Sequence, residues 1–363
     1  MDNHCHGLLA DPAPMSAEQL RLRFSETAFG PFPAEHTTTS VHYLWAIRQL
    51  SEKLDCDPTE QAVLEARAAR SQDEIDRLFM ADANISWLLV DDGYPDPADT
   101  VDRDTQARRT GARIGWVERI EVVAGNLVAG HATFAEFDEA MRAHLASARQ
   151  RGVCGLKSVA AYRSGLAVAV HGPGEAERAF DDMRRAGQTR LAAKPLVDHV
   201  VLLAMDAARD QELPVQFHTG YGDADADLLL ADPLHLAPLM HRYLTVPVVM
   251  LHGAYPYTRK LGILAATYPN AWLDVSYAIP FLTGRELLSV TREALAAAPG
   301  ARILYSSDGV GMAEHYWLGA VRGRRAIAEA LGELVARDEL RRDQALDIAG
   351  RIMHRNAERI YAL

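Results

Sequence analysis

Short apolar segments alternate with longer stretches of helical pattern along most of the chain. The apolar segments predict buried strands at 1–6, 85–90, 113–117, 153–159, 214–217, 246–251, 271–275 and 303–305. The helical patterns between them lie at 134–151, 196–211, 234–244, 259–268, 284–298 and 317–336. Strands that alternate with helices form parallel βαβ units. Eight such units predict an α/β protein built as a (β/α)8 TIM barrel.

The chain has 363 residues, a length that barrels reach as one domain, so we expect residues 1–363 to form a single barrel domain. An open, doubly wound sheet is the alternative. It is weakened because no glycine-rich phosphate loop follows an early strand.

Two segments between predicted strands are longer than a minimal barrel requires. Residues 8–82 separate the first predicted strand from the second and carry helical patterns at 40–53 and 59–79. They predict a helical insertion after strand 1, which either covers the barrel mouth as a lid or packs at its side. The charged segment 167–193 follows the fourth strand, and we expect it to border the mouth as well.

Charge and composition exclude several classes of partner. The net charge of -11 argues against nucleic acid, whose phosphates require clustered lysine and arginine. No apolar run approaches the roughly 20 residues of a membrane span, and no signal peptide is visible at the N-terminus. Three cysteines do not suggest a disulfide framework. We therefore expect a cytoplasmic protein that acts on a small molecule; a homo-oligomer is compatible with the sequence, which singles out no patch for one.

The first candidate site residues are His4 and His6, which form a His-x-His motif in the first predicted strand. Residues i and i+2 of a strand point to the same side, so both imidazoles can face one ion. The intervening Cys5 should point away. A His-x-His motif alone is weak evidence, because it is also frequent on protein surfaces.

Polar residues at the ends of later strands strengthen the case. Lys157 ends the fourth predicted strand, His218 and His252 follow the fifth and sixth, and Asp308 follows the eighth. In a barrel these ends converge on one rim, and buried polar groups there are costly unless they are paired or bind a metal. Each residue has a structural alternative, such as a helix N-cap for Asp308 or a snorkelling Lys157. All of them together are hard to explain by packing.

Histidines and a carboxylate favour a borderline divalent ion. Zn²⁺ is the simplest choice, and Mn²⁺ or Fe²⁺ also fit. A structural zinc site is normally closed and rich in cysteine, whereas this set is not, so a catalytic site is favoured over a metal that only stabilises an inactive barrel.

In this order of residues the chain resembles the amidohydrolase superfamily, and more narrowly its amidohydrolase-2 branch. His4 and His6 match the first-strand motif, His218 and His252 the later histidines, and Asp308 the eighth-strand aspartate. The ending Asn356-Ala357-Glu358-Arg359 is similar to the closing helix of the family. Residues 155–166 are similar to a subgroup associated with glutamine-synthetase-like proteins.

The resemblance implies a metal-dependent hydrolase that cleaves a C–N, amide-type bond of a γ-glutamyl or other carboxylate-bearing amide. The implied metal ligands are His4, His6, His218 and Asp308. Metal-bound hydroxide would attack, with Asp308 as general base and acid and His252 steadying the carbonyl oxygen. With two ions, His252 would become a ligand instead.

Lys157 leaves the metal count open, because many members of the branch have no lysine at this strand and hold one metal. Carboxylated, Lys157 would be a metal ligand that bridges two ions. Unmodified, it would be a catalytic cation beside a single ion.

The predicted substrate-binding residues are Tyr162 and Arg163, just past Lys157, and Tyr221, just past His218. A guanidinium suits carboxylate recognition, although Arg163 can equally pair with a structural acid. Glu118, after the third strand, is a further candidate for the pocket.

A second function stays open, since the same branch contains metal-dependent non-oxidative decarboxylases. Release of CO₂ rather than an amine would distinguish them.

Overall fold

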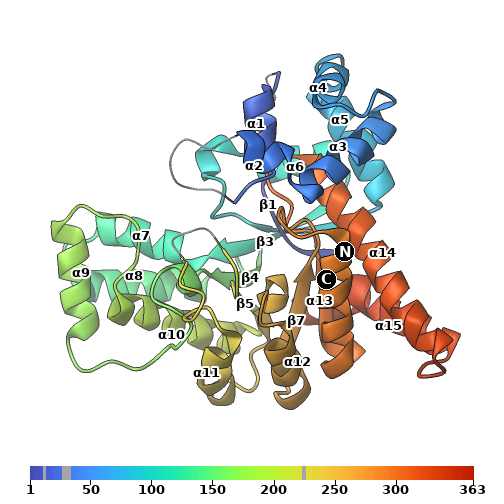
Figure 1. The fold of residues 1–363 in the computed structure, drawn as a ribbon. Coiled ribbons are helices and arrows are strands. Elements are labelled where there is room, and N and C mark those ends of the chain that lie inside the picture. The colour runs from blue at the N-terminus through green and yellow to red at the C-terminus, as the bar shows by residue number, and fades with distance from the viewer. Residues whose placement is uncertain (11–13, 27–33, 223–225) are drawn as a thin grey trace. The chain divides into compact units, whose positions relative to one another are not determined.

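The computed structural model describes residues 1–10, 14–26, 34–222 and 226–363 (Figure 1). Its eight strands form one sheet in chain order, from β1 to β8. They are β1 Asp2–His6, β2 Trp87–Asp91, β3 Arg113–Arg119, β4 Val153–Ser158, β5 Val215–Phe217, β6 Val248–Met250, β7 Ala271–Ser276 and β8 Ile303–Ser306. The pairings of β1 with β2 and of successive strands from β3 to β7 are parallel. The predicted (β/α)8 barrel is therefore confirmed.

Sixteen α-helices lie in the described part of the chain. They are α1 Ala17–Leu22, α2 Ala34–Thr38, α3 Val41–Leu54, α4 Glu60–Ala68, α5 Gln72–Ala83, α6 Arg103–Thr110, α7 Ile120–Gly130, α8 Phe134–Ala146, α9 Glu175–Arg185, α10 Lys194–Gln211, α11 Ala237–Arg242, α12 Thr258–Thr267, α13 Gly284–Ala297, α14 Ala313–Ala336, α15 Arg342–Gly350 and α16 Asn356–Tyr361. Within the described ranges, none of them has both the length and the apolar character needed to cross a bilayer.

The chain divides into two compact units. The first contains Met1–Ile114, Val275–Arg292 and Tyr305–His354, and the second contains Gly115–Asp274, Glu293–Leu304 and Arg355–Leu363.

In the first unit, the loop after β8 is joined to β1 by backbone hydrogen bonds. The N–H of His6 donates to the Gly309 carbonyl at 2.8 Å, and the N–H of Asp308 donates to the His4 carbonyl at 3.0 Å. The buried Asp2 carboxylate accepts the N–H of Ser307 at 2.8 Å. The first and last strands are thus adjacent, as a closed barrel requires.

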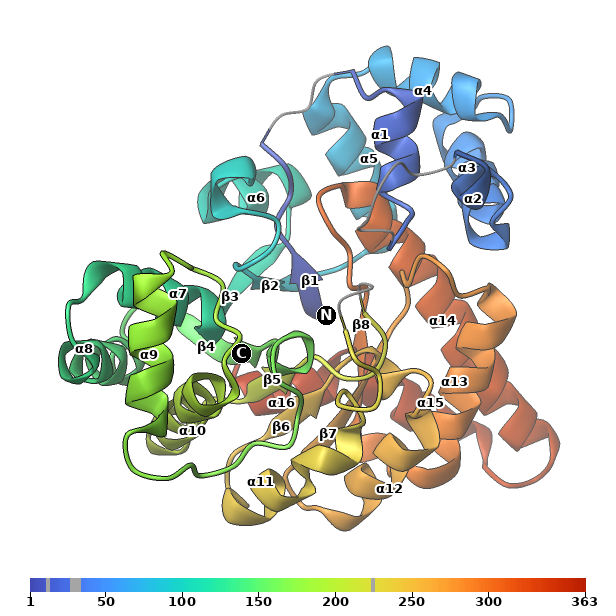
Figure 2. The same cartoon turned by 60° about the vertical axis from the view of Figure 1, so that its left-hand side comes forward.

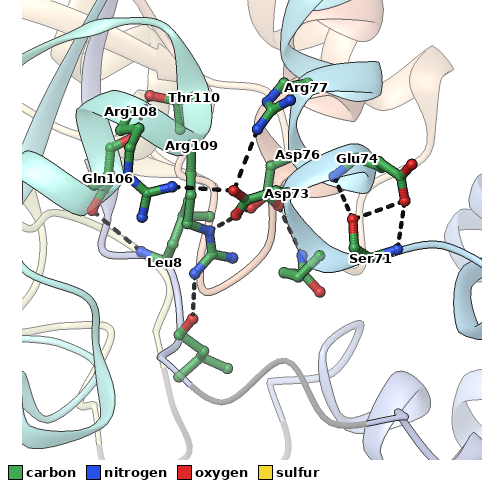
Figure 3. A network of polar contacts seen from close by, with 12 residues as sticks. Leu8, Ser71, Asp73, Glu74, Asp76, Arg77, Gln106, Arg108, Arg109 and Thr110 are labelled. Atoms are coloured by element: carbon green, nitrogen blue, oxygen red, sulfur yellow. Dashed lines mark hydrogen bonds and ion pairs between the residues drawn. The ribbon is translucent and has the colours of Figure 1, made fainter.

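The helices α1 to α5 lie between β1 and β2, where the sequence predicts an insertion. Parts of that segment, 11–13 and 27–33, lie outside the described residues. Helix α5 packs on α14 and on α6. Figure 3 shows how polar contacts fix α5 to α6: Arg109 Nε donates to Asp76 at 2.6 Å, and Arg108 donates to Asp73 at 3.1 Å. Arg77, which is on α5 itself, also donates to Asp73, at 3.3 Å.

The single helical pattern predicted at 59–79 is wrong in one respect, because it forms two helices. Helix α4 ends at Ala68 and α5 begins after Ser71. The Ser71 N–H donates to Glu74 at 2.8 Å, and the Ser71 hydroxyl accepts the Glu74 N–H at 3.4 Å. This capping box satisfies backbone donors that a new helix leaves without partners, so the chain restarts there.

In the second unit, β4, β5 and β6 pair in register, with Lys157 opposite Gln216 and Gln216 opposite Val249. Helices α7 to α10 pack beside one another (Figures 1 and 2), and α9 comes from the segment 167–193. The closing helix α16 is held by Asn356, whose amide donates to the carbonyls of Gly300 and Ile303 at 2.9 and 2.8 Å. The Asn-Ala-x-Arg ending therefore has a structural role.

Candidate metal centre

His4 and His6 extend from β1 toward one another, as their spacing predicts. Both are buried, and their ring centroids lie 5.0 Å apart in an edge-to-face arrangement. Cys5, between them, instead directs its sulfur to the Leu89 carbonyl at 3.5 Å. Burial is the largest cause that raises the pKa of Cys5, followed by the nearby Asp2, so this side chain is a neutral thiol.

The carboxylate of Asp308 lies close to both His4 and His6. Its Oδ1 atom lies 3.5 Å from His4 Nε2 and 3.5 Å from His6 Nε2. Two ligand atoms that each lie about 2.1 Å from a tetrahedral zinc ion are about 3.4 Å apart. A good hydrogen bond would be shorter, at about 2.7–3.2 Å. The three atoms therefore fit ligands of one divalent ion better than a hydrogen-bonded cluster.

The backbone around Asp308 explains how its carboxylate reaches this position. Asp308 has a left-handed conformation, with φ at 58°. The next residue must be glycine, because a Cβ on Gly309 would lie 2.1 Å from the Tyr316 ring. The Ser307 hydroxyl accepts the Gly309 N–H at 2.9 Å. Strained conformations of this kind cluster at functional sites.

Asp91 is a site residue that the sequence analysis missed. It ends β2 opposite His6 and is completely buried. One carboxylate oxygen of Asp91 and one nitrogen each of His4 and His6 all lie within 4.8 Å of one another. The signal was available, since Asp91 follows a buried apolar strand just as His218 and Asp308 do.

The second unit brings His218 and His252 together at the ends of β5 and β6. Both are buried, and their ring centroids lie 4.5 Å apart. His218 Nε2 lies 2.5 Å from the carbonyl oxygen of Tyr221. A carbonyl can only accept, so Nε2 carries the proton and Nδ1 is the nitrogen of His218 that can bind a metal.

The loops that carry these histidines are held together by backbone contacts and a backbone hydrogen bond. Gly220 has a φ of 76°, and a Cβ there would lie 2.4 Å from the Ala254 backbone. The Tyr221 N–H donates to the Tyr255 carbonyl at 2.7 Å. His252 itself has a φ of 64°, and its N–H donates to Asp274 at 3.3 Å. Close backbone packing thus sets the direction of both rings.

Lys157 is 1% exposed, at the end of β4. The residues that follow it are held by Glu121, the second residue of α7. The Glu121 carboxylate accepts the Ser158 hydroxyl at 2.6 Å and the Val159 N–H at 3.0 Å. Burial raises the pKa of Glu121 and outweighs the two hydrogen bonds that lower it. Glu121 therefore fixes the end of β4 from behind.

The predicted substrate residues separate into two groups. The Tyr162 ring lies 4.3 Å from the His218 ring, and the Tyr221 ring lies 5.6 Å from the His252 ring. Arg163, although adjacent to Tyr162 in sequence, lines a different cavity of about 190 Å³ with Glu121 and Arg190. Neither tyrosine nor either histidine lines that cavity.

Glu118 does not have the position that the sequence suggested. It lies within β3 rather than beyond it, and its carboxylate forms a two-pronged ion pair with Arg151 at 2.5 and 2.9 Å. His144 adds a contact at 3.0 Å. Burial alone would raise the pKa of Glu118, but these hydrogen bonds outweigh it and lower the pKa to about 2. Glu118 is a structural ion-pair residue.

Known proteins resemble this chain in sequence and in structure. A protein from Lactobacillus casei that is described as a metal-dependent hydrolase superposes with a TM-score of 0.90 and 28% identity over 100% of this chain and 94% of that one. A uronate isomerase from Thermotoga maritima, at 11% identity and a TM-score of 0.72 over 99% of this chain and 94% of that one, shares the fold.

The protein fluG of Emericella nidulans is 35% identical over 222 residues, which cover 58% of this chain. The matched part is 26% of fluG, so the chain spans about a quarter of the length of this relative. The sequence profile of the Amidohydrolase family matches residues 60–363, which is most of the chain. The chain therefore belongs to the amidohydrolase family.

Proposed function

We propose that this protein is a metal-dependent hydrolase that cleaves the C–N bond of an amide, with His4, His6, His218 and Asp308 as metal ligands. The observation that carries the proposal is the pair of 3.5 Å separations from Asp308 Oδ1 to the two β1 histidines. The similarity to the Lactobacillus casei protein, described as a metal-dependent hydrolase, supports the same reaction class.

The donor set fits a catalytic ion. Imidazole nitrogens and a carboxylate suit Zn²⁺, and they also accept Mn²⁺ or Fe²⁺. When bound, such an ion would lower the pKa of a water molecule and polarise a carbonyl group. Asp91, with an oxygen close to the nitrogens of His4 and His6, would be a further ligand on this side of the set.

The protein residues have separate tasks in this reaction. Asp308 is 16% exposed at its side chain, unlike the fully enclosed His4, so its carboxylate can take a proton from the nucleophile and return it to the leaving amine. His252 donates to the carbonyl oxygen as negative charge develops there. Lys157 is either a cation beside one ion or, once carboxylated, a ligand of two.

The substrate class we propose is an amide that carries a carboxylate, such as a γ-glutamyl amide. The Tyr162 ring lies at a tilt beside the His218 ring, and the Tyr221 ring lies in an edge-to-face arrangement with the His252 ring; both tyrosines would position the amide. The sequence also suggests Arg163 for the carboxylate, but its guanidinium lines a separate cavity with Glu121 and Arg190, so we do not assign it to the substrate that Tyr162 and Tyr221 would position.

The test combines metal content with product analysis. Protein purified without chelator is incubated with a panel of γ-glutamyl and other carboxylate-bearing amides, and released amine and CO₂ are both measured. We expect a divalent metal and amine release, with the release lost in Asp308→Asn. The matched control is Asp104→Asn, an exposed aspartate of α6.

The two products separate the competing reactions. CO₂ without amine would overturn the hydrolase and assign a decarboxylase to the same residues. Absence of bound metal after incubation with zinc or manganese would overturn the metal centre itself.

A further inference from the structure

A groove in the first unit contains an unusual concentration of positive charge. Its volume is about 530 Å³, and helices α3, α13 and α14 line it. Four arginines and a single glutamate contribute to its wall: Arg285, Arg292, Arg322, Arg325 and Glu329. The whole chain is acidic, with a net charge of -11, so this groove runs against the overall balance.

Arg322 forms the buried end of the groove. It is 5% exposed, and within the described residues it makes no ion pair with a carboxylate. One Nη atom donates to the Leu282 carbonyl at 2.9 Å, while the Nε atom is buried with no hydrogen-bond partner. Burial lowers the pKa of Arg322 to about 9, so the side chain remains a cation at neutral pH. A buried cation without a counter-ion is costly.

An aromatic surface accompanies this charge. The Trp45 ring lies against the Arg322 guanidinium, with the central carbon 4.0 Å from the ring centroid. Val41 and Leu288 also line the groove. Such a cation–π contact stabilises the guanidinium only in part, because the ring supplies no net negative charge. The groove thus offers cations next to an apolar, partly aromatic wall.

The arginines at the groove rim differ in their partners. Arg292 is neutralised by Glu333 through a salt bridge. Arg285 and Arg325 are exposed and make no ion pair with any described residue. Two rim cations and one buried cation therefore remain for a ligand.

We propose that this groove binds a small organic anion with two or more negative charges, whose planar or apolar body lies against Trp45. The anionic group would accept hydrogen bonds from Arg322 Nε and from Arg285 and Arg325. Phosphate and carboxylate share this chemistry, because guanidinium forks fit both. None of the residues proposed for hydrolysis lines the groove, so this site is separate from the proposed reaction.

The test is isothermal titration calorimetry on the full chain with three probes. ADP offers phosphates on a planar ring, tripolyphosphate offers phosphates alone, and citrate offers carboxylates alone. We expect one saturable binding site per chain, with an affinity that falls as salt is added. Preference among the probes distinguishes a phosphate ligand from a carboxylate ligand.

Variants assign the binding to the groove. We expect Arg285→Ala/Arg325→Ala, which changes only exposed side chains, to weaken binding about tenfold or more, a loss of about 1.4 kcal/mol. Arg322→Gln should do the same, and the double variant keeps the test decisive if Arg322→Gln does not fold. Trp45→Ala should weaken ADP more than tripolyphosphate.

The matched control removes two exposed arginines elsewhere, in Arg337→Ala/Arg342→Ala. It should bind all probes as the parent does. Failure of all three probes to bind overturns the proposal. Binding that the groove variants leave unchanged, or that the control weakens equally, also overturns it.

Discussion

The Nε2 atom of His4 lies 3.5 Å from the Oδ1 atom of Asp308, although His4 belongs to β1, the first strand, and Asp308 to the loop after β8, the last strand. The backbone makes this possible, because the Asp308 N–H donates to the carbonyl of His4 itself. The same pair of residues therefore joins the sheet and forms part of the proposed metal centre. A metal bound there would hold the two ends of the barrel together, since its binding free energy adds to the stability of the folded state.

The first prediction concerns this ligand set. Asp308→Asn should weaken metal binding by at least about 10–100-fold, the loss seen even when a partner outside the direct ligands is replaced. Competition with a metallochromic chelator measures it. Cys5→Ala is the matched control, because Cys5 lies between the two histidines but contacts the Leu89 carbonyl. Equal affinity in Asp308→Asn and the parent would remove Asp308 from the ligand set.

The second prediction concerns the number of ions. Lys157 is almost fully buried, so its side chain has no place in bulk solvent. If Lys157 is carboxylated and bridges two ions, we expect about two metal equivalents in the parent and fewer in Lys157→Ala. If it is an unmodified cation beside one ion, we expect about one equivalent in both. Metal analysis, with intact mass for the added carboxyl group, separates these outcomes.

The barrel and most strand positions could be predicted because buried parallel strands leave short, continuous apolar runs in the sequence. The run predicted at 271–275 became β7, Ala271–Ser276, and the one at 303–305 became β8, Ile303–Ser306. The ends of the helices were harder to predict from the sequence. The break between α4 and α5 depends on a cap at Ser71 that interrupts an otherwise continuous pattern.

Contacts between residues that are far apart in the sequence were the other limit on what could be predicted. The sequence places Glu118 near the pocket because nothing in its neighbourhood along the chain reveals that Arg151 neutralises it. The sequence does not separate Arg163 from Tyr162, since their directions differ only because the short helix Ala160–Tyr162 ends between them. Asp91 could have been predicted by the argument that selects Asp308, because it also follows a buried apolar strand.

The third prediction follows from the lowered pKa of Glu118. Its pKa is about 2 in the folded protein against an ordinary 4.5, so the unfolded chain binds a proton more tightly. The stabilisation is complete above about pH 4.5 and is lost as the pH falls toward about 2. Glu118→Gln should therefore lower the free energy of unfolding by a few kcal/mol at neutral pH, and by progressively less below pH 4.5.

Urea titrations across this pH range provide the measurement. Glu139→Gln is the control, because Glu139 is exposed on α8 and makes no ion pair with any residue in the described part of the chain. Its effect should be small at every pH. A Glu118→Gln deficit that does not change between neutral and acid pH would show that the ion pair is not the cause.

The last prediction concerns how the helices between β1 and β2 are attached. Arg67 of α4 donates to Glu314 of α14 at 2.5 Å, and the side chains are only 8% and 0% exposed. Removing one partner leaves a buried charge, so Arg67→Ala should destabilise the protein by about 3–5 kcal/mol.

The exposed pair of Arg77 and Asp73 is the control, and Arg77→Ala should cost about 0.5 kcal/mol or less. Denaturant unfolding measures both, and the Arg67→Met/Glu314→Leu double variant should recover most of the loss because no unpaired charge remains. A double variant as unstable as Arg67→Ala would mean that packing rather than charge holds α4 on α14.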